Sequence, residues 1–142
     1  MNYLQAFAIS GSGMTVEKAR VDLTAANLAN AHSTRAVDGT SVQPMRLVSS
    51  AKAAEFPAAL SAAAAALRGA EVTSVAPLNT PPRLVYEPGH PDADEKGFVS
   101  YPGINPVTEM VTLLTAVRAY EANVAALNAA KTMALRALQL GS

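Results

Sequence analysis

The chain has 142 residues, a length typical of one domain, and half of them are hydrophobic, although only seven are aromatic and none is tryptophan. Eleven Lys and Arg residues balance eleven Asp and Glu residues with no block of basic charge, which argues against a nucleic-acid-binding surface. The chain has no cysteine, which excludes disulfides, zinc–thiolate sites and cysteine nucleophiles.

The first sixteen residues carry no charge but do not form a secretory signal. They lack a Lys/Arg-rich start, and Gln5, Ser10, Ser12 and Thr15 interrupt any apolar run. No segment of the chain approaches the roughly 18–20 apolar residues of a membrane span. We therefore expect no membrane insertion, and export, if it occurs, without a cleaved signal peptide.

The first predicted element is a helix within residues 1–31. Apolar residues recur there in alternating steps of three and four, the spacing of a heptad seam. The glycines of Gly11-Ser12-Gly13 weaken a helix, so a bend or break is expected at that point. Asn30 is the expected C-terminal stop because Asn tolerates the left-handed conformation. The predicted seam consists of Leu4, Phe7, Gly11, Met14, Lys18, Val21, Ala25 and Leu28.

Residues 32–104 are predicted to form a small β-rich middle domain. All nine prolines of the chain lie between Pro44 and Pro106, so long helices are not expected there. An Ala-rich run near 58–67 has the composition of either a helix or a mobile insertion, and both interpretations stay open. The candidate strands are Ser41–Ser49, Glu71–Ala76, Arg83–Tyr86 and Gly97–Tyr101.

The stretch Tyr86–Phe98 (YEPGHPDADEKGF) has the composition of a chemical site. Asp92, Asp94 and Gly97 fall at positions 1, 3 and 6 of a calcium-binding EF-hand loop, but a lysine occupies position 5 and Gly103 occupies the position of the bidentate glutamate. Pro-Gly and His-Pro pairs favour turns, and Asp side chains accept from local backbone amides. The sequence therefore favours a tight loop between two strands, without a metal.

No catalytic pattern accompanies this loop. His32 and His90 are the only histidines, and neither lies in a nucleophile motif. Gly11-x-Gly13 lacks the third glycine of a dinucleotide-binding fingerprint. We therefore expect neither an enzyme nor a bound cofactor.

The last predicted element is a helix within residues 105–142. Asn105 is a suitable N-cap and Pro106 a suitable first helical residue. Leu114 and Leu135 widen its apolar face. The seam of this helix is predicted at Met110, Leu113, Val117, Tyr120, Val124, Leu127, Lys131, Ala134 and Leu138.

The fold class predicted from these elements is mainly α, with the N- and C-terminal helices paired in a coiled-coil-like layer and a small β-rich middle. The two seams can pack on each other in a parallel or antiparallel hairpin. Such long helices nevertheless expose more apolar surface than one partner covers, which favours assembly with other chains. The predicted assembly interface consists of Leu4, Phe7, Met14, Val21, Asn27, Leu28, Asn30, Met110, Leu113, Val117, Tyr120, Val124 and Leu127.

Several motifs resemble those of bacterial flagellar axial proteins, and in particular of the proximal-rod C-type rod proteins. Residues 9–14 (ISGSGM) and 27–31 (NLANA) resemble the N-terminal signature of the axial family. The C-type resemblance extends from residue 4 to Gly141, with departures at Gly103, where the family usually has Asn, and at the Ala-rich run. Its motifs are PRLVYEPGHPDAD (82–94), GFV (97–99), PGIN (102–105), EMV (109–111), RAYEAN (118–123) and LNAAK (127–131).

The resemblance implies a structural role. It places the terminal helices, 1–31 and 105–142, in the inner layer of a helical tube and residues 32–104 outside it. The implied partners are copies of the chain, other flagellar rod and axial proteins, and the flagellar type III export apparatus. The implied location is the periplasm-spanning rod of the basal body, which transmits torque. A calcium-dependent binding module and an unrelated coiled-coil adaptor are the alternative functions.

Overall fold

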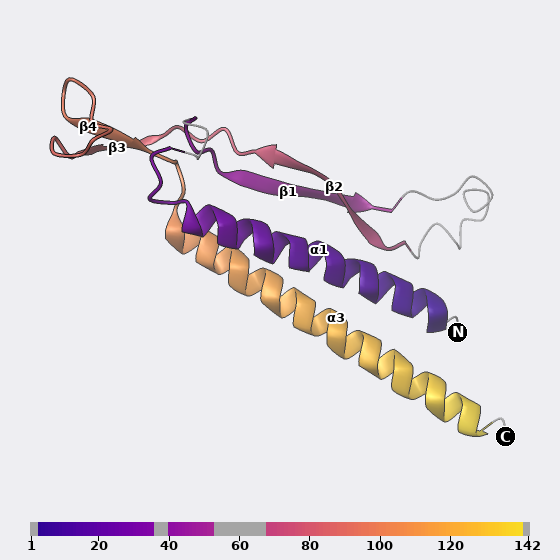
Figure 1. The fold of residues 1–142 in the computed structure, drawn as a ribbon. Helices are drawn as coiled ribbons and strands as arrows, with labels where there is room; N and C mark the ends of the chain where they lie inside the picture. Colours follow the sequence, from indigo (N-terminus) through magenta and orange to yellow (C-terminus); the bar gives the residue numbers. More distant parts are fainter. Residues whose placement is uncertain (1–2, 36–39, 53–67, 141–142) are drawn as a thin grey trace.

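The structure is a computed structural model that describes residues 3–35, 40–52 and 68–140 (Figure 1). Two long helices flank four short strands, which confirms the predicted fold class. The Ala-rich run at 58–67 lies outside the described residues. No helix in the described part of the chain is both long and apolar enough to span a membrane. The elements in chain order are α1 (Tyr3–Ala29), β1 (Met45–Ala51), β2 (Ala70–Pro77), β3 (Arg83–Tyr86), β4 (Phe98–Tyr101) and α3 (Pro106–Leu140).

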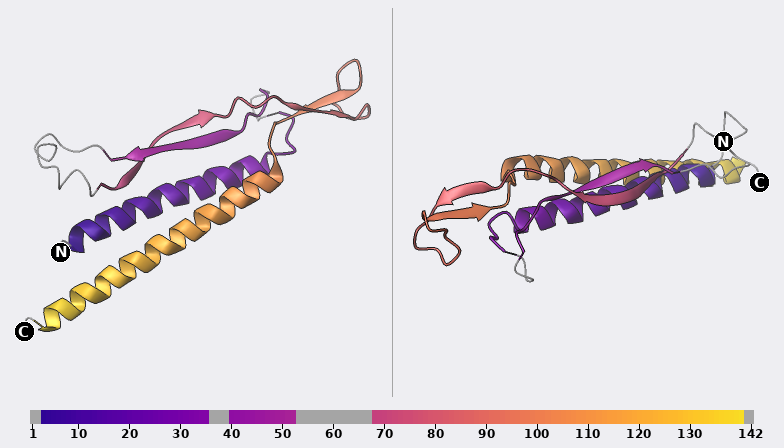
Figure 2. Two further views of the ribbon diagram at one scale, coloured as in Figure 1. Left: turned by 180° about the vertical axis from the view of Figure 1, so that it is seen from behind. Right: turned by 90° about the horizontal axis from the view of Figure 1, so that it is seen from above.

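The two helices lie side by side and run in opposite directions, so both termini lie at the same end of the molecule (Figures 1 and 2). The hairpin is therefore antiparallel. The axes are closest where α1 ends and α3 begins, and they separate towards the termini (Figures 1 and 2). With 35 residues against 27, α3 is the longer helix.

The start of α3 is as predicted. The Oδ1 atom of Asn105 accepts hydrogen bonds from the backbone N–H groups of Val107 at 3.0 Å and Thr108 at 3.4 Å, which is the geometry of an N-cap. Glu109 lies in the first turn, near the positive end of the helix dipole.

Helix α1 differs from its prediction in two details. It is continuous through Gly11 and Gly13, so the expected break is absent; the Ser12 hydroxyl donates to the Ile9 carbonyl at 2.7 Å within the helix. The helix ends beside Asn30 as expected. No non-glycine residue in the described ranges has a positive φ, however, so the prediction of a left-handed C-cap at Asn30 is wrong. Instead, the Asn30 side-chain amide donates to the Ala26 carbonyl at 2.9 Å.

Strands β1 and β2 form an antiparallel hairpin that lies along α1 (Figure 1). Met45 pairs with Pro77 and Ala51 with Ala70, with a register shift after Val48. The first strand was predicted to begin at Ser41 but begins at Met45, where Asn27 of α1 holds it. At the far end, the backbone N–H of Ala70 donates to the Ser12 hydroxyl at 3.0 Å, so both ends of the hairpin are attached to α1.

Strands β3 and β4 form a second hairpin, which projects beyond the helix pair on the side away from the termini (Figures 1 and 2). Arg83 pairs with Tyr101 and Tyr86 with Phe98, close to the predicted limits. Alternation along β4 buries Val99 and Tyr101 and exposes Phe98, which meets the Tyr86 ring edge-on at 5.4 Å between centroids.

Gly97, just before β4, is required by its conformation and by its surroundings. Its φ is +80°, and a Cβ atom there would lie 2.9 Å from the ring of Tyr86. We expect Gly97→Ala to lower the free energy of unfolding by about 1–3 kcal/mol. Alanine is strained in the left-handed backbone conformation, and its Cβ would crowd the Tyr86 ring. Urea denaturation measures this change. Gly89→Ala is the matched control, because the space around Gly89 is open within 4 Å; equal losses for the two variants would contradict the explanation.

Candidate assembly interface

Small side chains line the contact between α1 and α3. Ala116 is fully buried and Ala130 is 5 % exposed on α3, and Val16 is buried on α1. Gly13 lies against the side chain of Asn123, so closely that an added Cβ would be 2.9 Å from the Asn123 Oδ1 atom. The helices thus approach closely because the residues between them are small.

Part of the α3 seam therefore lies one residue before its predicted position. Residues 116, 123 and 130 repeat at heptad spacing and face α1, whereas their neighbours Val117 and Lys131 are exposed. The alternate positions of the predicted seam, Leu113, Tyr120 and Leu127, are partly buried as expected. The prediction was wrong for Met110, Val117, Lys131 and Leu138, which are exposed, whereas Val124 is partly buried. Large residues at these positions favoured the assignment, while the tertiary contact also uses smaller ones.

As a consequence, large apolar side chains of α3 face outward. Over its first three turns these residues form what we call the outer stripe: Val107, Met110, Val111, Leu114 and Val117, which are 37–70 % exposed. Leu135 and Leu138 are exposed near the C-terminal end, and Leu4 is exposed at the start of α1. A contiguous apolar surface of this kind is unusual on a chain that functions alone and is typical of an interaction site.

The thirteen residues predicted for the interface fall into three groups. Leu4, Asn30, Met110 and Val117 are exposed, and Asn27 is buried. The predicted interface omits Val107 and Val111, although their steps of four and three to Leu114 indicate one apolar helix face. The partly buried group consists of Phe7, Met14, Val21, Leu28, Leu113, Tyr120, Val124 and Leu127.

Asn27 joins three elements inside the chain. Its Nδ2 donates to the Met45 carbonyl at 2.7 Å, and its Oδ1 accepts from the Met45 backbone N–H at 3.0 Å. The same Nδ2 lies 3.3 Å from the Glu109 Oε2 at the start of α3. The amide of Asn27 thus pairs with β1 as a neighbouring strand would, and fixes where the hairpin and α3 meet α1.

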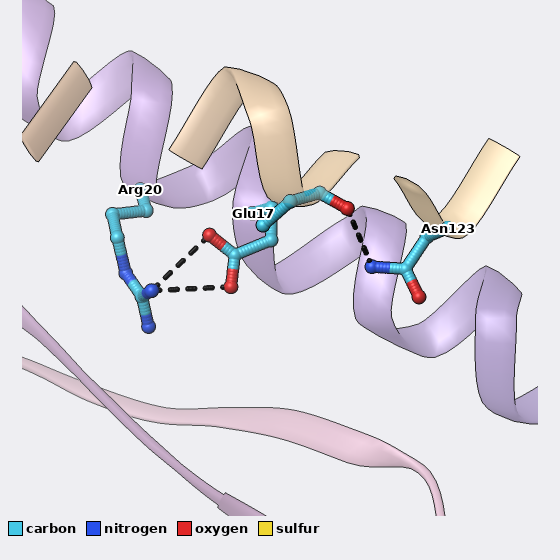
Figure 3. A network of polar contacts seen from close by, with 4 residues as sticks. Glu17, Arg20 and Asn123 are labelled. Atoms are coloured by element: carbon cyan, nitrogen blue, oxygen red, sulfur yellow. Dashed lines mark hydrogen bonds and ion pairs between the residues drawn. The ribbon is translucent and has the colours of Figure 1, made fainter. Parts of the chain in front are cut away.

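Further along the helices, the polar side chains of Glu17, Arg20 and Asn123 lie near one another (Figure 3). Arg20 and Glu17, one turn apart on α1, form an ion pair at 3.1 Å that is largely shielded from solvent at the carboxylate. The Asn123 amide on α3 donates to the Ala119 carbonyl of its own helix at 2.9 Å. Each of these interactions stays within one helix, so the groups satisfy one another without linking α1 to α3.

A groove opens between the helices. Its volume is about 310 Å³, and Val21, Val117 and Tyr120 give it an apolar lining, with Lys18 and Asp22 of α1 at its edge. It brings together three residues of the predicted interface that come from both ends of the sequence.

The acidic segment between β3 and β4 is a compact loop of successive hydrogen-bonded turns, as predicted. Asp94 accepts from the backbone N–H groups of Lys96 at 2.9 Å and Phe98 at 2.8 Å. Asp92 accepts from the Thr34 hydroxyl at 2.7 Å and pairs with Arg35 at 2.8 Å. The carboxylates proposed for calcium are thus engaged with the protein, and no metal-binding cluster of His, Asp or Glu occurs in the ranges that the structure describes.

Tyr101, at the end of β4, contacts several polar and charged side chains beside this loop. Its hydroxyl donates to the Glu87 carboxylate at 3.0 Å, and this hydrogen bond, with burial, raises the pKa of the Tyr101 phenol. Both histidines, His32 and His90, meet its ring edge-on at 6.4 Å, and the Arg83 guanidinium lies 5.6 Å from the ring centroid. The two histidines therefore pack around a structural tyrosine.

The fold and its exposed apolar faces define the class of protein: a structural subunit that is part of a larger assembly. Residues 95–140 match the family described as flagellar basal body rod FlgEFG protein, C-terminal. The chain is 41 % identical to the flagellar basal-body rod protein FlgC of Salmonella typhimurium, 40 % identical to that of Escherichia coli O6:H1 and 36 % identical to that of Bacillus subtilis, over 99 % of both chains in each case. The chain belongs to the family of flagellar basal-body rod proteins FlgC.

Proposed function

We propose that this chain forms part of the flagellar drive shaft, assembling helically with copies of itself and with related axial proteins to transmit torque across the periplasm. One observation carries this proposal: small side chains fill the seam between α1 and α3, and the outer stripe remains uncovered. Each outer-stripe side chain buried against a neighbouring subunit contributes roughly 0.5–2 kcal/mol, because 37–70 % of it remains to be buried. A layer of such contacts, repeated along a helical stack, resists twisting without covalent links.

In this proposal the chain divides into two layers. Residues 1–31 and 105–142 form the inner layer and provide the contacts, and residues 32–104 form the outer domain. The antiparallel hairpin of α1 and α3 supports the inner layer, because it holds the exposed apolar faces of both chain ends on one body. The proposed interface consists of the exposed and partly buried residues of the predicted set, whereas Asn27 acts within the subunit.

The proposed route to the rod is the flagellar type III export apparatus, without a cleaved signal peptide. The uncharged and interrupted apolar character of the first sixteen residues supports this route. The mass of the chain recovered from basal bodies checks it, since loss of an N-terminal peptide would contradict it. The balanced charge and the engaged carboxylates of the β3–β4 loop support a role without nucleic acid, cofactor or catalysis.

Deletion of the gene tests the function. We expect deleted cells to lose swimming and to form basal bodies without a complete rod, and the full chain supplied from a plasmid to restore both. Electron microscopy of purified basal bodies gives the readout. Complete rods in the deleted cells would show that the chain is not a required rod subunit.

A further inference from the structure

The β1–β2 hairpin changes character at its register shift. Val48 pairs with Ser74 and Ser49 with Val72, so Thr73 lies between these pairs without a partner residue in the ladder. An extra residue of this kind is a β-bulge, at which a strand bends and the ladder is interrupted. The bulge divides the hairpin into two parts, which we call the base (45–48 with 74–77) and the arm (49–51 with 70–72).

The base is attached firmly to α1. Its side chains Met45, Leu47 and Val48 are partly buried, and the hairpin lies along α1 (Figure 1). Asn27 makes its two hydrogen bonds to the Met45 backbone at this end. Beyond Met45, the backbone N–H of Leu78 donates to the Pro44 carbonyl at 2.7 Å and extends the ladder. Apolar contacts and several hydrogen bonds thus hold the base together.

The arm is attached to α1 by a much smaller contact. All of its residues except Ala70 are exposed, so it gains little from apolar burial. Between the described residues of the arm and α1, the hydrogen bond runs from the Ala70 N–H to the Ser12 hydroxyl, which itself donates to the Ile9 carbonyl. Gly69 lies so close to this hydroxyl that an added Cβ would clash with it. One such hydrogen bond stabilises a contact only modestly, because water offers the same bond when it breaks.

The two strands of the arm are better joined to each other than to α1. The backbone N–H of Lys52 donates to the Gly69 carbonyl at 2.7 Å, which extends the ladder beyond the arm. The Ser50 and Thr73 hydroxyl oxygens are 2.9 Å apart and form a hydrogen bond between the strands at the bulge. The arm therefore keeps its own pairing when it leaves α1.

We infer that the arm is a strap that swings away from α1 about the bulge at Thr73, while the base and the helix pair stay in place. The opening step breaks the Ala70–Ser12 hydrogen bond and uncovers the side of α1 around Ser12. Among the described residues, the backbones of β1 and β2 lie close to α1 and not to α3, so opening leaves the helix pair intact. The inference concerns the single subunit and does not rest on the proposed function.

Amide hydrogen exchange of the dilute full chain, followed by NMR, tests the strap with three backbone N–H groups. Ala70 bonds to Ser12 of α1, Lys52 bonds within the hairpin beyond the arm, and Met45 bonds to Asn27 at the base. We expect Ala70 to be about ten-fold less protected than Lys52 and Met45, because swinging of the arm frees the first group alone.

Two other outcomes overturn the inference. Equally low protection of Ala70 and Lys52 would mean that the two strands separate from each other, since Lys52 lies further from the base than the arm itself. Equally high protection of all three groups would mean that the arm stays on α1. Neither outcome affects the proposed function, which depends on the helices.

Ser12→Ala removes the acceptor of the Ala70 N–H. We expect the protection of Ala70 to fall by about five-fold, and that of Lys52 and Met45 to change by less than about two-fold, because the arm keeps its pairing and the base keeps Asn27. Thr15→Ala is the matched control, since the exposed Thr15 hydroxyl donates at 3.1 Å to the Gly11 carbonyl of its own helix; it leaves all three groups unchanged. If Ser12→Ala lowered the protection of Lys52 as far as that of Ala70, the arm would be paired only while it lies on α1, which would contradict the strap.

Discussion

Replacing both Met110 and Val117 by aspartate is expected to abolish rod assembly while the monomer stays folded. Both side chains belong to the outer stripe, and 51 % of Met110 and 37 % of Val117 remain exposed on the monomer and available to a neighbouring subunit. In the rod the exposed part of each would be buried, and the change removes about 1–3 kcal/mol of apolar contact and introduces two carboxylates without partners. The resulting weakening is about 100-fold or more per contact. Swimming and basal-body micrographs measure the loss, and circular dichroism of the purified variant measures the helix content.

The matched control for this variant is Ala122→Asp. Ala122 is exposed on α3 but lies on a different face from Met110 and Val117. We expect normal rods from it. If the double variant also lost its helices, the defect would be one of folding. If the folded double variant built normal rods, the outer stripe would not be an assembly surface.

The second large effect concerns the stability of the subunit rather than its assembly. Asn27→Ala is expected to lower the free energy of unfolding by about 2–3 kcal/mol, because it removes two hydrogen bonds to the Met45 backbone and leaves both groups without their partner. For a chain of this size the melting temperature falls by several degrees, roughly 6–12 °C. The β1–β2 hairpin also loses its attachment at this end of α1. Thermal unfolding followed by circular dichroism measures the change.

Asn30→Ala is the control for Asn27. Asn30 is exposed, and within the described residues its side chain bonds only to the Ala26 carbonyl of its own helix. We expect its replacement to change stability by less than about 0.5 kcal/mol. If the two variants melted at the same temperature, the junction of α1, β1 and α3 would not depend on the Asn27 amide.

The distribution of side-chain size explains how one short chain can be both a weakly packed monomer and part of a stiff shaft. Within the described residues the buried apolar set is small and includes three alanines, at positions 31, 116 and 130. Small residues let α1 and α3 approach closely, but they contribute little apolar area. Most of the large apolar area of α3 is thus available to neighbours.

The sequence by itself determined the elements and the class of protein. Proline placement separated the terminal helices from the middle, Asn105 and Pro106 located the start of α3, and turn residues located the β3–β4 loop. These features depend on local chemistry, in which a proline or a cap acts on its immediate neighbours whatever the rest of the chain does. The number of apolar residues at heptad spacing also indicated that one molecule could not bury all of them.

Only the tertiary structure decided which side of each helix faces its partner. On α3, a seam through Val117 and one through Ala116 both satisfy the heptad rule, and hydrophobicity alone favours Val117. The structure places Ala116 inside because Gly13 and Asn123 lie against each other, and the β1–β2 hairpin, held by Asn27 and Ser12, occupies another side of α1. The facing side of a helix depends on contacts between residues far apart in the chain, which the periodicity of one segment does not contain.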